Sequence, residues 1–111
     1  MAIHHAAAGE VIDVRPLKQK IAETKTTTLL KTSVMEVLRL VMPAGKSIAE
    51  HKAPGEITVH CLEGKIVFTS DGNAQELVAG ELLYLDAAVP HAVEAVEDSS
   101  ALVTILLSKR A

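Results

Sequence analysis

Aromatic residues are almost absent from the sequence, which has no tryptophan, one tyrosine and one phenylalanine among 111 residues. The net charge of −3 is small, and the charged residues are scattered along the chain rather than grouped. Proteins that bind nucleic acids use aromatic stacking platforms or clusters of basic residues. The sequence therefore predicts no nucleic-acid partner.

Long hydrophobic runs are missing as well. Hydrophobic residues make up 49% of the chain, yet no uninterrupted run approaches the roughly 18 residues that a membrane-spanning helix needs. Residues 1–8 lack the basic start and the long apolar stretch of a signal peptide. We therefore expect no membrane association and a cytoplasmic location.

Cysteine is represented by a single residue, Cys61, which excludes an internal disulfide. It lies close to Val59, Leu62 and Val67, which favours a buried, unreactive thiol. None of the serines stands in the Gly-x-Ser-x-Gly elbow of serine hydrolases, and there is no glycine-rich phosphate-binding loop. The sequence gives no sign of a catalytic nucleophile.

The length is that of one domain. We predict a flexible N-terminal tail at residues 1–9 and a single domain at residues 10–111. His4 and His5 lie in the predicted tail, where paired histidines are more often incidental than metal ligands.

Short segments of alternating or wholly apolar residues recur along the chain, separated by glycine, proline, aspartate and asparagine. Asp71-Gly72-Asn73 is the strongest turn signal, and residues 101–107 are apolar on both faces, which suits a central strand. Many short strands without a long helix indicate an all-β antiparallel sandwich or barrel. The predicted strands are residues 10–14, 25–31, 35–42, 48–52, 56–62, 65–70, 76–78, 82–85, 91–96 and 101–107.

Two stretches each place a histidine beside a turn. In residues 45–64, His51 precedes Ala53-Pro54-Gly55, and in residues 80–91, His91 follows Pro90. In a small barrel, two such histidines can meet in one cavity.

These stretches resemble the two motifs of the cupin family. Gly45, His51 and Gly64 match the first motif, G-x5-H-x-H-x3,4-E-x6-G, and Gly80 and His91 match the second, G-x5-P-x-G-x2-H-x3-N. The resemblance covers roughly residues 35–107 and implies a double-stranded β-helix, or jelly-roll barrel. It also implies a site for iron, manganese, zinc or nickel built from three histidines and one glutamate.

The chain departs from both motifs at ligand positions. Ala53 stands where the family has its second histidine, Ile57 stands where it has glutamate, and Ala95 replaces the asparagine. Of the four usual ligands, only His51 and His91 are carried over.

His60 and Glu56 are candidates for completing the metal site. They share one face of the strand at residues 56–62, because side chains alternate along a strand. If that face looks into the barrel, His51, His60, His91 and Glu56 can together hold a divalent transition metal such as zinc, iron, nickel or manganese. Ile57 has the opposite parity to His60, so only a bulge would let both face inward. The alternative makes His60 a hydrogen-bonded interior residue that lines a pocket for an organic ligand.

For three further polar residues the sequence predicts a position but no specific role. Tyr84 either packs in the core or points into the cavity. Asp86 is assigned to turn chemistry, with a hydrogen bond to an imidazole as the alternative. Glu63, at the end of a hairpin strand, is expected to face solvent.

The residues support two functions. The first is a metal-dependent oxygenase, isomerase or lyase that acts on a small organic molecule, and the alternative is a metal-free module that binds or senses such a molecule. We also expect a homodimer that pairs through its N-terminal strands. Strands that are apolar on both faces, such as residues 102–107, leave apolar surface that one small domain cannot bury alone, and pairing edge strands across a two-fold axis removes exposed edges.

Overall fold

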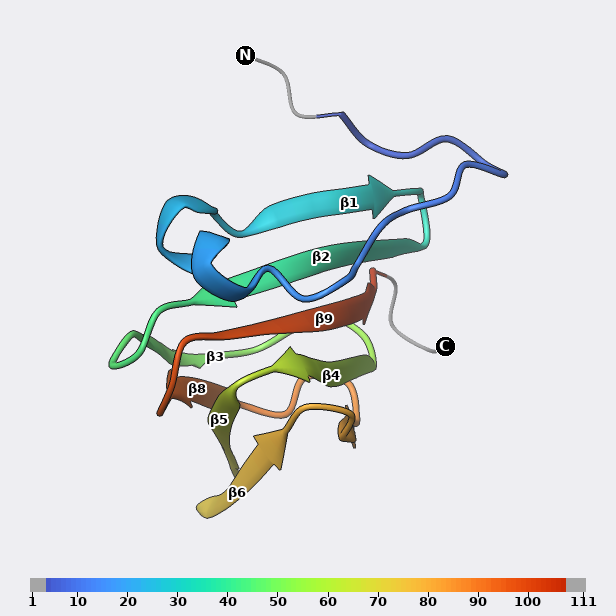
Figure 1. Ribbon diagram of the computed structural model, residues 1–111. Helices are drawn as coiled ribbons and strands as arrows, with labels where there is room; N and C mark the ends of the chain where they lie inside the picture. Colours follow the sequence, from blue (N-terminus) through green and yellow to red (C-terminus); the bar gives the residue numbers. More distant parts are fainter. Residues whose placement is uncertain (1–3, 108–111) are drawn as a thin grey trace.

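The computed structural model describes residues 4–107, which form nine β-strands and one 3-10 helix (Figure 1). The helix is η1 (Lys18–Glu23). The strands are β1 (Thr27–Lys31), β2 (Met35–Met42), β3 (Ser47–His51), β4 (Ile57–Glu63), β5 (Lys65–Ser70), β6 (Asn73–Val78), β7 (Leu82–Leu85), β8 (His91–Ala95) and β9 (Ser99–Leu106).

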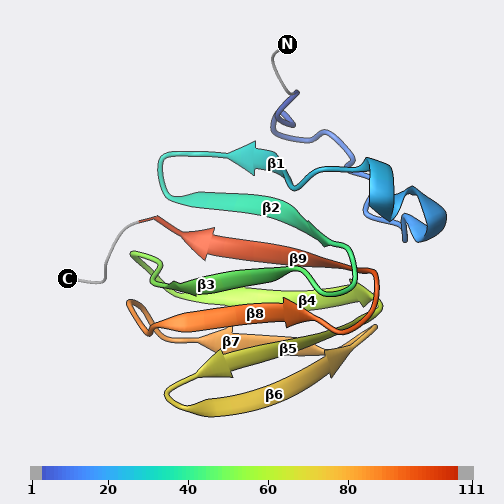
Figure 2. The same cartoon turned by 90° about the vertical axis from the view of Figure 1, so that its left-hand side faces the viewer.

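The strands build two antiparallel sheets that face each other (Figure 2). One sheet has the order β1-β2-β9-β4-β7, and the other has the order β3-β8-β5-β6. This arrangement confirms the predicted all-β jelly-roll fold. The doubly apolar strand β9 lies in the middle of the five-stranded sheet, between β2 and β4.

Nine of the ten predicted strands are present, with ends shifted by a few residues at most. The strand predicted at residues 10–14 is wrong, because this segment pairs with no neighbour. Ile12 and Val14 are nevertheless half-buried. The alternating pattern therefore reflects contact with the rest of the protein rather than membership of a sheet.

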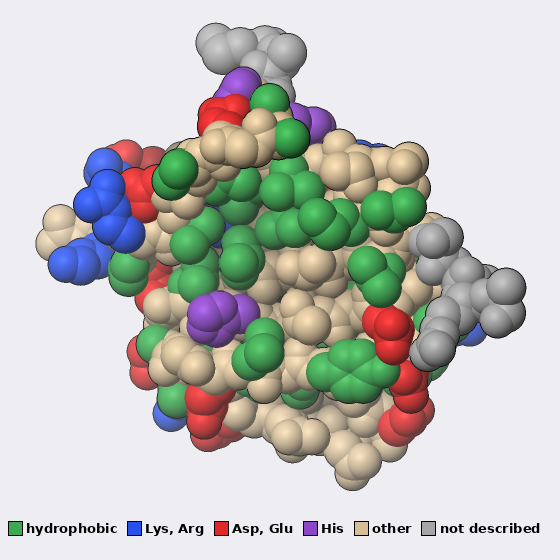
Figure 3. Space-filling view, turned by 90° about the vertical axis from the view of Figure 1, so that its right-hand side faces the viewer, with side chains coloured by type: hydrophobic (Ala, Val, Ile, Leu, Met, Phe, Trp, Pro, Cys, Tyr) green, Lys and Arg blue, Asp and Glu red, His purple; other side chains and the backbone are tan. Residues whose placement is uncertain are grey.

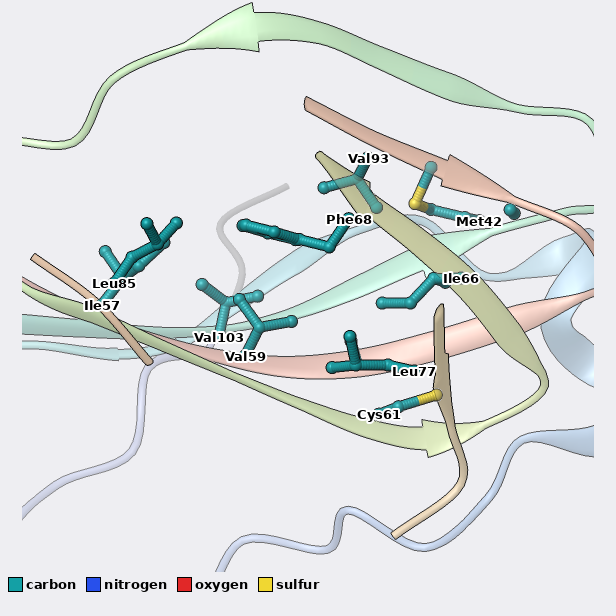
Figure 4. Close-up of a cluster of buried hydrophobic side chains, with 12 residues drawn as sticks. Met42, Ile57, Val59, Cys61, Ile66, Phe68, Leu77, Leu85, Val93 and Val103 are labelled. Atoms are coloured by element: carbon teal, nitrogen blue, oxygen red, sulfur yellow. The ribbon is translucent and has the colours of Figure 1, made fainter. Parts of the chain in front are cut away.

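The hydrophobic core lies between the two sheets (Figure 4). Strand β4 contributes Ile57, Val59 and Cys61, whose side chains are buried, while the residues between them are only half-buried. The inward face of β4 is thus the wholly apolar one. Burial also raises the pKa of the Cys61 thiol, in agreement with the expected unreactive cysteine.

Two tight turns depend on backbone conformations that glycine adopts easily. Asp71 and Gly72 have φ angles of 49° and 77° between β5 and β6, which suits a two-residue hairpin. Gly64, with φ of 83°, joins β4 to β5 and packs so tightly that a Cβ would collide with Asp98 and Ser99. The last glycine of the first motif is therefore required by packing.

A buried ion pair ties the N-terminal segment to the five-stranded sheet. The backbone N–H groups of Leu17 and Lys18 each donate to the Glu63 carboxylate over 2.8 Å. Arg39, which is 7% exposed, donates to the carbonyl of Arg15 and lies 3.4 Å from Glu63. The expectation that Glu63 faces solvent is wrong, since its side chain is only 13% exposed.

The pKa of Glu63 is lowered in this environment. Burial by itself raises the pKa, but hydrogen bonds from Ser100, Leu17 and Lys18, together with the charge of Arg39, outweigh it. The carboxylate therefore stays ionised and holds the segment in place.

The start of the chain also contacts the sheet, where Ala6 donates a backbone hydrogen bond to Leu29. Residues 1–3 of the predicted tail lie outside the described residues, and the flexibility of residues 1–9 stays a prediction. Among residues 4–107, no helix has the length and apolarity needed to cross a membrane.

Candidate functional site

A pocket of about 330 Å³ opens between the two sheets. Strands from both sheets supply branched apolar side chains to its wall, and four polar residues join them. The apolar residues are Leu38, Leu40, Ile48, Ala53, Pro54, Ile57, Val59, Phe68, Val93, Val103, Ile105 and Leu107, and the polar ones are Glu36, His51, Lys52 and His91.

His51 and His91 come together in this pocket. They end β3 and begin β8, and the register of these antiparallel strands places the two residues opposite each other. Their ring centroids are 4.2 Å apart, with an interplanar angle of 64°, so the edge of one ring meets the face of the other. His91 is only 5% exposed, whereas His51 is open to solvent.

Hydrogen bonds to the backbone fix both imidazoles in the same tautomer. Nδ1 of His51 lies 3.0 Å from the carbonyl of Ala49, and Nδ1 of His91 lies 2.9 Å from the carbonyl of Val89. A carbonyl oxygen can only accept, so each Nδ1 carries the proton. In the neutral rings each Nε2 is therefore an acceptor with a free lone pair.

The surroundings of His91 favour its neutral form. Burial lowers the pKa of His91. The hydrogen bond to Val89 raises it by less than burial lowers it, and the nearby His51 adds a smaller lowering. Phe68 stacks on the His91 ring with centroids 5.3 Å apart and an interplanar angle of 14°. This contact holds the ring in one orientation.

The two histidine stretches are also joined through their turns. The N–H of Ala88 donates to the carbonyl of Ala53 over 3.0 Å, linking the turn before β8 to the one after β3. Ala88 has a φ of 63°, a left-handed conformation, and it occupies the position of the second glycine in the second cupin motif. The link keeps His51 and His91 on the same side of the pocket.

The two ligand positions that the sequence lacks lie in the same pocket. Ala53 and Ile57 both line it, at the positions where the cupin motif has a histidine and a glutamate. The pocket therefore holds all four motif positions, of which two carry histidine and two carry apolar residues.

His60 and Glu56 do not join the histidine pair. His60 alternates with the buried Val59 and Cys61, so it lies on the outer face of the five-stranded sheet, between Leu82 and Leu102. The hypothesis that its face looks into the barrel is wrong, because burial of three apolar side chains outweighs burial of a histidine. Glu56, on the same face, is absent from the pocket wall.

Glu56 instead belongs to a polar cluster at the end of β7. The Tyr84 hydroxyl lies 2.7 Å from a Glu56 oxygen and 2.6 Å from an Asp86 oxygen. Tyr84 is 57% exposed, so it neither packs in the core nor points into the cavity. Asp86 contacts the tyrosine rather than an imidazole.

The residues present do not fit the metal site that the cupin resemblance implies. Structural and catalytic zinc sites use at least three protein ligands. Among residues 4–107, no group of three or more histidine, cysteine, aspartate or glutamate side chains is placed to hold a metal. His51 and His91 alone supply two donors, and the third and fourth positions carry a methyl group and an isoleucine.

Residues 38–107 match the family profile of the cupin domain. The chain belongs to the cupin family. This match agrees in extent with the two histidine motifs and with the jelly-roll barrel.

Several solved structures share the fold. A conserved protein of unknown function from Streptococcus pyogenes is 24% identical over 100% of both chains, with a TM-score of 0.76. A predicted oxalate decarboxylase from Thermotoga maritima is 27% identical over 74% of this chain and 78% of its own, with a TM-score of 0.66. A DMSP lyase from Ruegeria pomeroyi is 22% identical over 73% of this chain and 45% of its own, with a TM-score of 0.67. No curated protein matches the sequence.

Proposed function

We propose that this cupin is a metal-free binding protein for a small, largely apolar organic molecule, anchored by His51 and His91. The observation that carries the proposal is the pocket itself. It keeps two imidazoles, while Ala53 and Ile57 extend its apolar wall into the remaining ligand positions. Such a pocket, mostly apolar with a few convergent polar groups, is typical of small-molecule sites.

The tautomers define the polar part of the ligand. Because each Nδ1 donates to a backbone carbonyl, each Nε2 can only accept a hydrogen bond while the ring is neutral. The matching group on the ligand is a donor, such as a hydroxyl, a phenol or an N–H. An apolar body of branched aliphatic or aromatic character fills the space between the sheets.

The pocket volume limits the size of the ligand. At about 330 Å³, it lies near the lower end of the roughly 300–1,000 Å³ range of small-molecule sites. A single substituted ring or a short branched alcohol suits this space, whereas a nucleotide or a sugar with many hydroxyls would leave polar groups unpaired against the aliphatic wall.

A binding survey tests the proposal. Purified protein is titrated by calorimetry with two sets of compounds. The first set carries a hydroxyl or N–H donor, as phenols and branched alcohols do, and the second contains matched compounds that lack the donor. We expect donor compounds to bind more tightly than their matched analogues, and His91→Ala to remove most of this difference. His60→Ala is the control, since His60 lies outside the pocket, and it should leave binding unchanged. Equal affinity for both compound classes, or equal loss in the two variants, would refute the proposal.

A metal-dependent enzyme is the second candidate, favoured by the 4.2 Å approach of two imidazole rings in one cavity. For this function a bound molecule would have to supply the missing donors. Calorimetry with zinc and nickel, repeated in the presence of the best organic ligand, separates the two functions. Metal binding at one ion per chain that requires His51 and His91 would favour the enzyme.

A further inference from the structure

A second pocket, of about 610 Å³, lies between the N-terminal segment and the outer face of the five-stranded sheet. Its wall is built from residues 13 and 15–20 together with Arg39 of β2. Arg39 alternates along β2 with Leu38 and Leu40, which line the pocket between the sheets. The two pockets therefore lie on opposite faces of β2 and are separate sites.

The second pocket is basic, although the protein is acidic overall. Asp13 is the acid in its lining, and the basic residues are Arg15, Lys18, Lys20 and Arg39. Even when Glu63 beside Arg39 is included, the basic groups exceed the acidic ones by two, in a chain whose net charge is −3. Figure 3 shows lysine and arginine side chains gathered at the upper left edge of the molecule, whereas acidic side chains are spread over its lower half. A local excess of positive charge attracts anions.

Arg39 brings a hydrogen-bond donor without an acceptor to this pocket. Only 7% of the residue is exposed. Its Nη2 group donates to the carbonyl of Arg15 over 2.6 Å and to the Ser100 hydroxyl over 3.2 Å, and it lies 3.4 Å from Glu63. The Nε atom is buried and has no hydrogen-bond partner among residues 4–107. Buried polar groups are nearly always paired, so an acceptor atom that binds in the pocket would complete the hydrogen bonds of this guanidinium.

The hydrogen bonds around η1 hold two lysines at the same pocket. The N–H of Lys18 donates to the Glu63 carboxylate over 2.8 Å, and the N–H of Lys20 donates to the carbonyl of Leu17 over 3.0 Å. Both lysine side chains line the pocket with Arg39. The fold therefore places two point charges beside a planar, permanently charged donor group.

We propose that this pocket binds a phosphate group, carried by inorganic phosphate or by a phosphate monoester of a small molecule. A phosphate dianion matches an excess of two positive charges, whereas a carboxylate carries a single charge. Its oxygens can accept from Nε of Arg39 and from both lysines together, and arginine and lysine are the side chains that commonly bind phosphate. Asp13 forms an ion pair with Arg15 over 2.8 Å, which offsets its repulsion of the anion.

Calorimetric titration of the full chain with inorganic phosphate tests the proposal. The ionic strength is held constant and the pH is about 8, where phosphate groups are dianionic. We expect one phosphate per chain, bound at least about tenfold more weakly by Lys20→Glu, because a carboxylate then repels the anion. Lys31→Glu is the matched control. It makes the same charge change at an exposed position of β1 outside the pocket, and it should bind phosphate like the wild type.

Phenyl phosphate distinguishes the two sources of the phosphate group. Tighter binding of phenyl phosphate than of inorganic phosphate would support a phosphorylated small molecule as the ligand, and equal binding would support free phosphate. His91→Ala should leave the affinity for both unchanged, since His91 lies in the pocket between the sheets. Loss of phosphate binding in His91→Ala but not in Lys20→Glu would place the anion in that other pocket and overturn the proposal.

Nitrogen-15 NMR of the arginine Nε–H groups reports on Arg39 directly. The Arg39 signal is assigned by its loss in Arg39→Lys, and we expect phosphate to shift it in the wild type and in Lys31→Glu. At the same phosphate concentration the shift should be much smaller in Lys20→Glu, and circular dichroism confirms that each variant keeps its fold. An Arg39 signal that phosphate does not shift, equal loss of affinity in Lys20→Glu and Lys31→Glu, or no binding at about 10 mM phosphate would each overturn the proposal.

Discussion

His51 and His91 face each other across two antiparallel strands, with ring centroids 4.2 Å apart and each Nδ1 hydrogen-bonded to the carbonyl two residues earlier in the chain. Hydrogen bonds to the backbone thus preorganise the pair. What it can bind is decided by the side chains beside it, which are those of Ala53 and Ile57.

Restoring the two missing donors should create a metal site. We expect Ala53→His combined with Ile57→Glu to bind one zinc or nickel ion per chain, at least about 100-fold more tightly than the wild type, because four donors then converge on one cavity. Calorimetry measures the affinity, and a rise in melting temperature on adding metal confirms that the folded protein binds it.

The matched control for this variant is Ala53→His combined with Thr58→Glu. Thr58 is the next residue along β4 and lies on the opposite face from Ile57, so its carboxylate points away from the pocket. Equal metal affinity in the two double variants would show that the pocket does not correspond to the cupin metal site.

Acidification should weaken the protein through His91. Its pKa is lowered in the folded state, mainly by burial, whereas in the unfolded chain a histidine titrates near pH 6.5. As the pH falls below about 6.5, the unfolded state therefore binds the proton first, and the stability that neutral His91 contributes is lost.

Urea unfolding at pH 8 and pH 5 measures this loss. The wild type should lose more stability between the two pH values than His91→Gln, which has no proton to bind at that position. Ligand affinity should fall at lower pH, as the pH passes through the lowered folded pKa of His91, because a protonated Nε2 no longer accepts a hydrogen bond. The same loss in both proteins would rule out His91 as the cause.

The contact between Glu63 and residues 17–18 should contribute measurably to the free energy of unfolding. Glu63→Gln removes the charge that Arg39 and two backbone N–H groups share, and we expect a loss of about 1–3 kcal/mol in the free energy of unfolding. Glu76→Gln, an exposed change on β6, is the control and should cost almost nothing. Urea unfolding at pH 7 measures both.

The effect of Glu63→Gln should also depend on pH. Because the folded pKa of Glu63 is lowered, its contribution is fully present above the unfolded value of about 4.3 and is lost as the pH falls through the folded pKa. The wild type and Glu63→Gln should therefore converge in stability in acid. A difference that stays constant down to pH 2 would contradict the assigned ionisation.

The sequence predicted the fold well because local signals agreed with each other. Each local signal selects one conformation: the turn at Asp71-Gly72, the tight connection at Gly64, and the alternation of apolar and polar residues within β2 and β5. Residues 10–14 misled the strand prediction, since a segment that lies against a sheet can show the same alternation as a strand that pairs in it.

The site was predicted in part. His51 and His91 are the two ligands that the motif carries over, and the structure places them in one pocket. The prediction for His60 was wrong because it gave more weight to a third metal ligand than to the hydrophobicity of the opposite face of β4. On that face Ile57, Val59 and Cys61 are buried.

The contact between Arg39 and Glu63 could not be predicted from sequence. The two residues are 24 positions apart. Glu63 occupies an unspecified position of the first motif and Arg39 lies outside both motifs, so no motif pairs them. Only the fold brings the end of β4 against the middle of β2 and the start of η1.

Mass spectrometry of the untagged, freshly purified protein under native conditions, combined with elemental analysis, tests the central claim most directly. We predict metal well below about 0.1 ion per chain and, in a fraction of the protein, a small organic molecule that His91→Ala loses and His60→Ala keeps. One metal ion per chain in the wild type, lost when His51 and His91 are both replaced by alanine, would contradict the account.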